Sequence, residues 1–390
     1  MTKKISFHTL LLLAAHISSF CAINNNKPKP LPAKNIATIV INDALSILSI
    51  TNTRIAISYP DGCSIWDYST NKKIFQLIQH NKCSRNQYIT LNKDRTKLAL
   101  SYINSTKFTE SHLSIYNTST GKKIWKTTLS SSTTDSPAFS PTDDDVILIG
   151  DFKDGILCFN YTNNTIRKYP FPFEKTGIFN VPSFNPTKEE YITSRGSIYT
   201  LSTNELLFDL DSYFTSSKYS PSGKLIVLCD IHGSCAIFET QSQKINYLIK
   251  EPSSCCNKID AIDFDQTSRI LAIIPSLGKS IEYWNAETRT LIAISELPEQ
   301  YKKIAYSPTS CNRITFSPNG KKIVIATGNQ CLILQVPFEL IYNMEAVYIP
   351  DTKNKCISLL SILNQFTSVS IPPDIKRLLI YSFLKISKVG

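Results

Sequence analysis

Cysteine and histidine are the residue types in this chain that are best suited to redox, metal or nucleophilic chemistry, and the chain has 11 cysteines and 5 histidines. No two cysteines form a CxxC spacing and no two histidines form HxxxH, the spacings that bring two ligands to one zinc ion. His80, His112 and His232 have no GxSxG or similar nucleophile motif nearby, so we interpret them as surface residues in loops and turns. The sequence therefore predicts no catalytic residue, no metal site and no cofactor.

Two pairs of cysteines are candidates for disulfide bonds. Cys229 and Cys235 flank a short turn and would lie opposite each other in one hairpin, whereas Cys255 and Cys256 are adjacent in the chain. Exported proteins keep such bonds. The alternative is that most of the cysteines are small apolar strand residues.

An aromatic segment between prolines, YPFPF, is the candidate for contact with a partner. Tyr169, Phe171 and Phe173 are large side chains with few rotamers, which are favoured as binding anchors. The alternative is a loop that packs onto a neighbouring part of the fold. A run of acids, Asp143–Asp145, could hold a cation, but three adjacent carboxylates cannot all turn to one ion, so we favour a solvated turn.

The elements that must position these residues are repeats of one unit, seen most clearly over residues 314–336. A short apolar run is followed there by the turn Ser317–Gly320, by the β-branched run Ile323–Ile325 and by a third apolar strand. Copies of this unit, aligned on the residue at Phe316, begin at Leu48, Leu91, Phe139, Phe184, Tyr219 and Phe264. A period of about 45 residues is typical of propeller blades. One unit cannot bury both faces alone, so we predict an all-β fold: a closed, seven-bladed β-propeller of four-stranded antiparallel blades.

The ring must also close. The last unit ends near Val336–Pro337 without a convincing fourth strand, whereas the strand-like run Ile36–Ile41 precedes the first full unit. We therefore predict that Ile36–Ile41 pairs with Leu332–Val336 and supplies the missing outer strand, which leaves no long sheet edge unpaired. We expect a monomer.

The two ends of the chain differ from the repeats. Residues 1–22 combine an early positive charge, an apolar stretch and small residues, a pattern typical of an export signal, and 23–35 is a polar, proline-punctuated linker. The propeller is expected over 36–337 and a helical extension over 338–390. No later segment has the roughly 20 apolar residues of a membrane span. We expect an exported protein, periplasmic or secreted, without a transmembrane segment.

The net charge of +11 is spread over nearly every turn. A nucleic-acid site would need a basic stripe with interleaved aromatic residues, and no blade repeats that pattern. The charge therefore favours solvated blade edges, with attraction to an anionic surface as the alternative, and predicts no nucleic-acid partner.

The repeated F-S-P-x-G-K turn and an aromatic residue followed by Asp, Asn or Glu in the third strand resemble the WD40 and YVTN-type propeller repeats. Trp66-Asp67 is the literal pair, and the chain lacks the Gly-His dipeptide of the typical eukaryotic repeat. The relaxed pairs are Tyr116-Asn117, Phe159-Asn160, Phe238-Glu239 and Trp284-Asn285. The resemblance covers residues 36–336 and implies a non-catalytic scaffold that binds a protein or peptide partner on its loop faces.

Two weaker resemblances leave alternatives open. The turn of Asn117–Trp125 and the adjacent Cys255 and Cys256 resemble features of quinone-cofactor-dependent dehydrogenase propellers, which would make the protein an enzyme. Ile371–Ile375 with the apolar residues that follow resembles the start of an F-box, which would make it an adaptor or effector. A plain amphipathic helix is the alternative for that tail.

Overall fold

The computed structural model describes residues 31–337, with gaps at 42–43, 45, 61, 80–86, 104–109, 130–135, 152–154, 170–182, 194–195, 211, 213, 215, 231–232, 250–258, 276–279, 298–313 and 327–329. All described elements belong to one compact unit, Lys29–Pro337. The predicted signal peptide and the predicted helical extension, with its F-box-like segment, lie outside the described residues.

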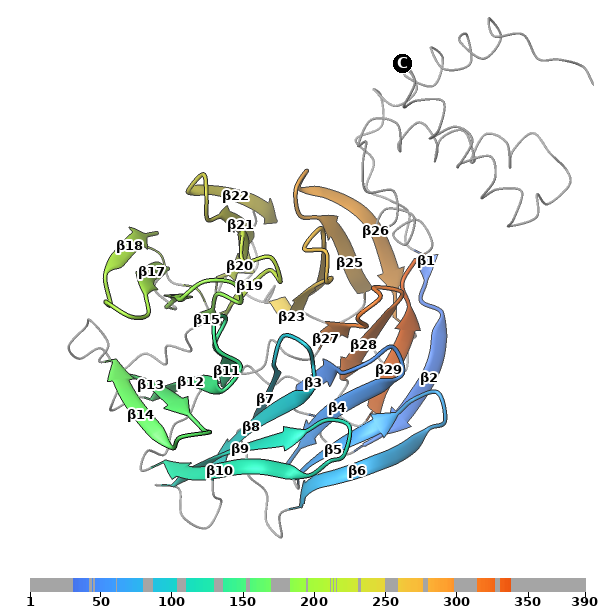
Figure 1. Ribbon diagram of the computed structural model, residues 1–390. Coiled ribbons are helices and arrows are strands. Elements are labelled where there is room, and N and C mark those ends of the chain that lie inside the picture. Colours follow the sequence, from blue (N-terminus) through green and yellow to red (C-terminus); the bar gives the residue numbers. More distant parts are fainter. Residues whose placement is uncertain are drawn as a thin grey trace, which may run out of the picture. The chain divides into compact units, whose positions relative to one another are not determined.

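Seven antiparallel sheets follow one another along the chain and surround a common axis (Figure 1). This arrangement confirms the predicted seven-bladed propeller. From the innermost strand outward, blades 1 to 4 are β3 (Ser46–Ser49), β4 (Arg54–Tyr59), β5 (Gly62–Asp67), β6 (Lys72–Gln79); β7 (Gln87–Leu91), β8 (Lys97–Ile103), β9 (Ser111–Asn117), β10 (Lys123–Leu129); β11 (Ala138–Phe139), β12 (Val146–Asp151), β13 (Gly155–Asn160), β14 (Thr165–Tyr169); β15 (Ser183–Phe184), β16 (Glu190–Ile192), β17 (Ser197–Thr200), β18 (Leu206–Asp209). Blades 5 to 7 are β19 (Ser216–Tyr219), β20 (Leu225–Cys229), β21 (Cys235–Glu239), β22 (Lys244–Ile249); β23 (Ile259–Phe264), β24 (Ile270–Pro275), β25 (Ser280–Asn285), β26 (Thr290–Glu296); β27 (Ile314–Phe316), β28 (Lys322–Ala326), β29 (Gln330–Gln335), β2 (Asn35–Val40).

The second strand of a blade is covered on both faces, which explains its unbroken apolar run. In β28, Ile323, Val324 and Ile325 are all fully buried although neighbouring side chains point to opposite faces. The outermost strand β14 is exposed along most of its length instead. Clusters of buried apolar side chains lie between successive blades, so the blades stabilise one another as stacked layers.

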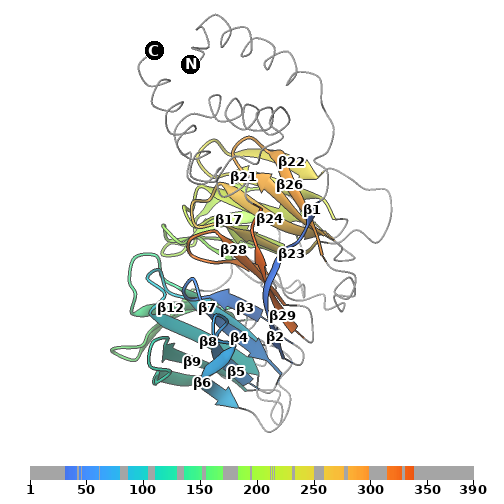
Figure 2. The ribbon, with the colours of Figure 1, turned by 90° about the vertical axis from the view of Figure 1, so that its right-hand side faces the viewer.

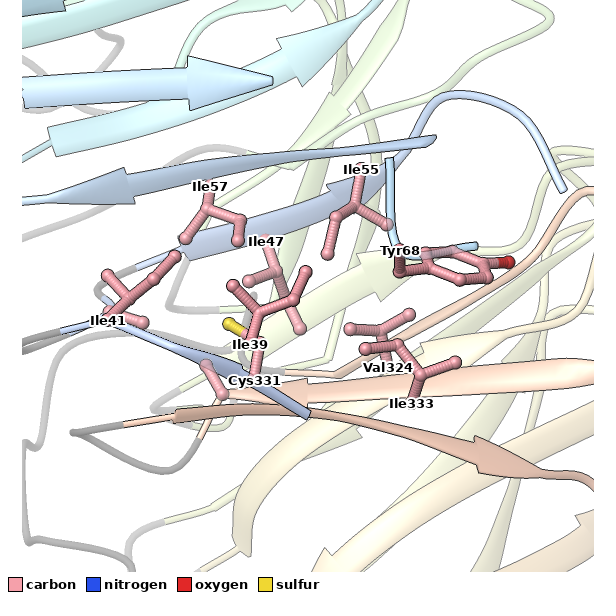
Figure 3. Packing of buried hydrophobic residues seen from close by; sticks show 11 residues of the cluster. Ile39, Ile41, Ile47, Ile55, Ile57, Tyr68, Val324, Cys331 and Ile333 are labelled. Carbon is pink, nitrogen blue, oxygen red and sulfur yellow. The ribbon is translucent and has the colours of Figure 1, made fainter. Parts of the chain in front are cut away.

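The first and last parts of the ring meet in blade 7. Strand β2 pairs antiparallel with β29, with Ala37 opposite Ile333 and Thr38 opposite Leu332 (Figure 2). Ile39 of this strand is 1% exposed and packs between blades 7 and 1, among Ile47, Ile57 and Ile333 (Figure 3). The predicted closure of the ring is therefore confirmed.

A short strand precedes this closure. Strand β1 (Leu31–Pro32) pairs in parallel with β26, and Ala33 N donates a hydrogen bond of 2.9 Å to the carbonyl of Glu296. The end of the segment that the sequence interpretation assigned to a linker therefore adds a fifth strand to blade 6 before the chain enters blade 7.

Candidate interaction surface

Two sets of turns lie on the same side of blades 1 to 6, because strands of a blade alternate in direction; blade 7 has the first turn alone, since its third and fourth strands, β29 and β2, are not consecutive in the chain. We call the turn between the first and second strands the inner turn, the turn between the third and fourth strands the outer turn, and the side of the propeller that carries both the turn face. The connections on the opposite side fall largely in the gaps of the description. The turn face is therefore the surface whose side chains the structure defines best.

In blades 2 to 7 the inner turn is capped by the polar residue that follows the position of Phe316 in the repeat, whereas in blade 1 Thr51 Oγ1 accepts Arg54 N at 3.0 Å. In blade 6, Asp265 accepts hydrogen bonds from the backbone N–H groups of Thr267 (3.0 Å), Arg269 (2.9 Å) and Ile270 (2.7 Å). Ser317 of blade 7 accepts one from Lys322 N, at 2.9 Å. The Ser of the F-S-P-x-G motif therefore stabilises a tight turn by binding its backbone.

The outer turns use the Asp or Asn of the WD-like pairs in the same way. Asp67 Oδ1 accepts Ser69 N at 2.9 Å, and Asn117 Oδ1 accepts Ser119 N at 3.0 Å and Thr120 N at 2.9 Å. Asn160 and Asn285 make the equivalent pairs of bonds. The polar half of these four WD-like pairs is thus a turn cap, whereas Glu239 of the fifth pair accepts the Ser242 hydroxyl at 2.8 Å and pairs with Arg289 of blade 6.

Hydrogen bonds also join the turns of neighbouring blades. They connect blades 3 and 4 (Thr142 Oγ1 to Glu189 Oε1, 3.2 Å), 4 and 5 (Asn185 Nδ2 to Gly223 O, 3.3 Å), 5 and 6 (Ser222 N to Ser268 Oγ, 2.9 Å), 7 and 1 (Asn319 N to Asn52 Oδ1, 3.0 Å), and 1 and 2 (Arg95 to Ser49 O). Blades 6 and 7 are joined through their innermost strands, where Phe316 N of β27 donates to Asp263 Oδ2 of β23 at 2.8 Å. The turn face is therefore one connected framework and not a set of independent loops.

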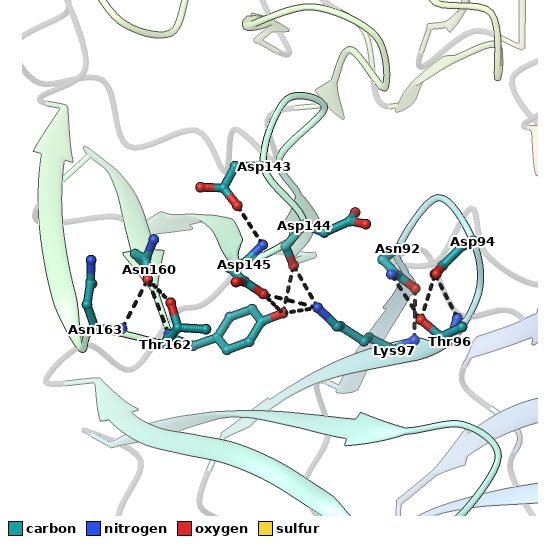
Figure 4. Close-up of polar contacts among 11 residues, drawn as sticks. Asn92, Asp94, Thr96, Lys97, Asp143, Asp144, Asp145, Asn160, Thr162 and Asn163 are labelled. Atoms are coloured by element: carbon teal, nitrogen blue, oxygen red, sulfur yellow. Dashed lines mark hydrogen bonds and ion pairs between the residues drawn. The ribbon is translucent and has the colours of Figure 1, made fainter.

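The link between blades 2 and 3 is a cluster of charged and polar groups, which we call the 2/3 clasp: Lys97, Asp144, Asp145 and Tyr161 (Figure 4). Lys97 Nζ lies 2.7 Å from the Tyr161 hydroxyl and 3.1 Å from Asp145 Oδ1. The Tyr161 hydroxyl donates to the carbonyl of Asp144 at 2.6 Å. The ammonium also lies 5.3 Å from the centre of the Tyr161 ring, within reach of a cation–π interaction.

The clasp shifts the pKa values of its charged groups. The hydrogen bond from Lys97 lowers the pKa of the Asp145 carboxyl against a smaller opposing effect of burial. Burial lowers the pKa of Lys97, but the hydrogen bonds to Tyr161 and Asp145 outweigh it and the pKa is raised. Both shifts favour the ion pair.

The same arrangement recurs between blades 7 and 1, in the 7/1 clasp: Lys322, Tyr68 and Asn52. The Tyr68 hydroxyl donates to the carbonyl of Asn52, Lys322 Nζ lies 3.4 Å from that carbonyl, and the ammonium lies 4.7 Å from the centre of the Tyr68 ring. Burial is the main cause that raises the pKa of Tyr68 to about 12. The two tyrosines follow directly on Asp67 and Asn160, the polar halves of two WD-like pairs.

The acidic run has three different roles in this framework. Asp143 Oδ1 accepts the backbone N–H of Asp145 at 2.8 Å, Asp145 binds Lys97, and the Asp144 carboxylate points away from both (Figure 4). Within the described ranges, no group of three or more His, Cys, Asp and Glu side chains is arranged to hold a metal ion.

A further charged group lies on the innermost strands. Lys218 Nζ is 2.7 Å from Asp263 Oδ1, and both side chains are largely buried. Burial lowers the pKa of the Arg95 guanidinium, and the charge of Asp263 opposes that effect. Because the two carboxylate oxygens of Asp263 bind Lys218 and Phe316 N, this ion pair connects blades 5, 6 and 7.

The candidate contact residues are only partly described. Tyr169 ends β14 and packs against the cluster between blades 3 and 4 that includes Tyr191 and Phe184. Phe171 and Phe173 lie outside the described residues. Contact of this segment with a partner stays a prediction.

The candidate disulfides are also only partly described. Cys229 and Cys235 are paired across β20 and β21, both are buried, and their sulfur atoms are 3.9 Å apart as free thiols. Hydrogen bonding to Cys235 and burial raise the pKa of the Cys229 thiol. Cys255 and Cys256 lie outside the described residues. The hairpin places the first pair opposite each other as predicted, and both disulfide bonds stay predictions.

His112 does not lie in a loop, contrary to the sequence interpretation. It belongs to β9, its ring centre is 5.0 Å from that of Tyr102, and a ring nitrogen is 3.1 Å from the Thr128 hydroxyl. Burial lowers the pKa of His112, which favours the neutral imidazole. These contacts give it a packing role in blade 2. His80 and His232 fall in gaps of the description.

The fold and its turns define a class of protein, a seven-bladed β-propeller with WD40-like blades. No protein-family model matches the sequence, and no curated protein sequence matches it. Solved structures do match the fold. The β-propeller domain of Cps50 (Swd1) from Myceliophteria thermophila is similar with a TM-score of 0.61 and 13% sequence identity, over 78% of this chain and 100% of that one. At this identity the similarity shows the fold alone.

Along the described part of the chain, no helix has the length and apolar character that a membrane crossing requires.

Proposed function

We propose that this propeller is a non-catalytic scaffold that binds a protein or peptide partner on a loop face. The observation that supports the proposal most directly is the connected framework of the turn face. Turns that are fixed in this way lose little backbone conformational entropy on binding, so a large surface is already organised for a partner.

Site-specific photo-cross-linking tests this proposal. A photoreactive amino acid placed at Thr120 or Asn319, on the turn face, should give a cross-linked partner from the native source, and the purified partner should then bind the chain directly. The matched control is Val40, which is 72% exposed on the outer strand β2. Cross-linking that is equally strong at Val40, or no direct binding by the purified partner, would contradict a turn-face scaffold.

The quinone-dependent enzyme is the alternative, and one observation weakens it. The residues of the turn after Asn117 have a structural role without a cofactor. Asn117 binds the N–H groups of Ser119 and Thr120, and Gly121 adopts the positive φ of 68° that the turn requires. The turn after Asn285 uses the same device. Incubation with the quinone and calcium, followed by a dye-reduction assay with alcohols or sugars, tests the alternative, and turnover would overturn the scaffold.

Export and the F-box-like adaptor role rest on residues outside the description and stay predictions. N-terminal sequencing of the protein from its native source tests export, because an intact Met1 would contradict signal cleavage.

A further inference from the structure

Charge is distributed unevenly over the turn face. The turns of blades 7, 1 and 2 carry an excess of basic side chains, which we call the basic sector. Its exposed members are Lys34, Lys72, Lys73, Lys93, Lys122, Lys123 and Lys321. In the described turns of these blades the acids are Asp67 and Asp94, and hydroxyl and backbone hydrogen bonds from Ser69 and Thr96 occupy their carboxylates.

The neighbouring blades 3 and 4 carry the opposite charge on the same face. We call this the acidic sector; its members are Asp143, Asp144, Asp145, Glu189, Glu190 and Glu205. Lys188 is the base in the described turns of these blades and lies 3.5 Å from Glu190. The sequence alone indicates that positive charge is spread over nearly every turn. In the structure, the positive charge of the turn face is concentrated on blades 7, 1 and 2.

Two lysines of the basic sector lie over aromatic rings. Lys73 Nζ lies 5.6 Å from the centre of the Trp66 ring and Lys123 Nζ lies 5.7 Å from that of Tyr116. Both rings belong to WD-like pairs, and Tyr116 is almost fully buried. The ammonium groups are thus positioned over fixed rings, which lowers the entropy that each lysine loses when it binds an anion.

We propose that the basic sector is the docking surface for an acidic segment of a partner protein. This rests on the proposed scaffold function and assigns the chemistry of its partner. Attraction between a fixed set of ammonium groups and carboxylates steers association and sets orientation.

Two features favour an acidic protein segment over other polyanions. The Tyr116 ring is buried and the Trp66 ring is half-buried beneath Lys73, so these rings offer little surface on which bases could stack. The acidic sector lies beside the basic sector, so it would repel a long polyanion that extends from blade 2 onto blades 3 and 4. A partner that is acidic over a limited length fits this boundary.

Fluorescence anisotropy with a labelled peptide of alternating Glu and Ser is the test, with the same peptide carrying Gln for Glu as the uncharged probe. The triple variant Lys72→Gln, Lys93→Gln, Lys122→Gln should weaken binding about tenfold, whereas a matched variant on blades 4 and 5, Lys188→Gln, Lys224→Gln, Lys244→Gln, should change it less than about twofold. Higher salt should remove the difference. These lysines are exposed, and melting curves check that both variants keep the fold.

Several outcomes overturn the proposal. Equal losses in the two triple variants would mean that binding follows total charge and not the basic sector. Tighter binding of a single-stranded oligonucleotide than of the acidic peptide would assign the surface to nucleic acid, and self-association that the first variant abolishes would assign it to a second copy of the chain. If a partner cross-links at Thr120 but ignores the basic-sector substitutions, the scaffold function stands and this inference fails.

Discussion

The boundary between blades 7 and 1 and the boundary between blades 2 and 3 are built on the same plan. In each, a lysine at the start of a second strand lies over a tyrosine of the next blade, and that tyrosine binds a carbonyl of its own inner turn. Lys97 additionally meets the carboxylate of Asp145, whereas the position that corresponds to Asp145 in blade 1 is Thr53. The 2/3 clasp contains an ion pair that the 7/1 clasp lacks.

The missing ion pair in the 7/1 clasp indicates which contacts stabilise the closure of the ring. Residues 123–165 join the outer strands of blades 2 and 3 in one continuous stretch of chain, but blades 7 and 1 are joined by β2, which comes from the start of the described chain. Because the 7/1 clasp lacks the additional charge, we expect the apolar cluster around Ile39 to provide most of the stabilisation at this boundary.

Deletion of residues 1–40 should destabilise the boundary between blades 7 and 1 more than any other change proposed here. It removes β1 and β2, exposes the edge of β29 and uncovers the cluster between blades 7 and 1, so we expect loss of the cooperative unfolding transition and aggregation. Calorimetry and light scattering measure both. Deletion of residues 1–28 leaves the unit Lys29–Pro337 complete and is the control. A 1–40 deletion that melts like this control would refute closure by β2.

Single substitutions in β2 test whether its buried face stabilises the closure of the ring. Ile39→Ala should lower the free energy of unfolding by about 2–5 kcal/mol, because Ile39 is buried among branched side chains that cannot collapse fully around the cavity. Val40→Ala, at the next position of the strand, should change it by less than about 0.5 kcal/mol, because Val40 is 72% exposed. Denaturant titration measures both, and similar losses would show that the strand is not seated as described.

The architecture can be predicted from the sequence, because it follows from short turn and strand patterns that repeat along the chain. The turn Ser317–Gly320 and the run Ile323–Ile325 predict a hairpin covered on both faces, and copies at a constant period predict the ring. Even the joining of Ile36–Ile41 to the last blade followed from counting strands. The linker prediction missed β1, since Leu31–Pro32 is too short to show a pattern and its pairing with β26 depends on the ring.

The turn-face interactions were not accessible in the same way. Asp67 and Asn117 were recognised as parts of a repeat, but a hydrogen bond that caps a turn is a local geometry that the motif only implies. The clasps join residues far apart in the chain: Lys322 and Asn52 are 270 positions apart. The basic and acidic sectors share this cause, because they form when turns from distant segments come together.

Removing the two clasp lysines tests the comparison directly. Lys97→Met should destabilise the fold by about 1 kcal/mol, since it removes a charge-assisted hydrogen bond and a cation–π contact and leaves Asp145 without its ammonium partner. Lys322→Met should cost about half as much, since its polar partners are a carbonyl and a ring. Denaturant titration gives both values, and a larger effect for Lys322→Met would show that the ion pair adds nothing to the 2/3 clasp.

The smallest expected effect is a difference in acid sensitivity between the clasps. The hydrogen bond from Lys97 lowers the pKa of Asp145 in the folded protein below its ordinary value of 3.8. A lowered folded-state pKa contributes stability that is present above the unfolded-state value and is lost as pH falls through the folded-state pKa. A double-mutant cycle with Lys97→Met and Asp145→Asn should therefore give a coupling of a few tenths of a kcal/mol at pH 7, small because both groups are partly exposed, that declines toward zero below about pH 4. The matched cycle with Lys322→Met and Tyr68→Phe should keep its coupling over the same range, because it involves no carboxylate. A Lys97–Asp145 coupling that persists in acid would mean that the contact is made through the Asp144 carbonyl and the tyrosine alone.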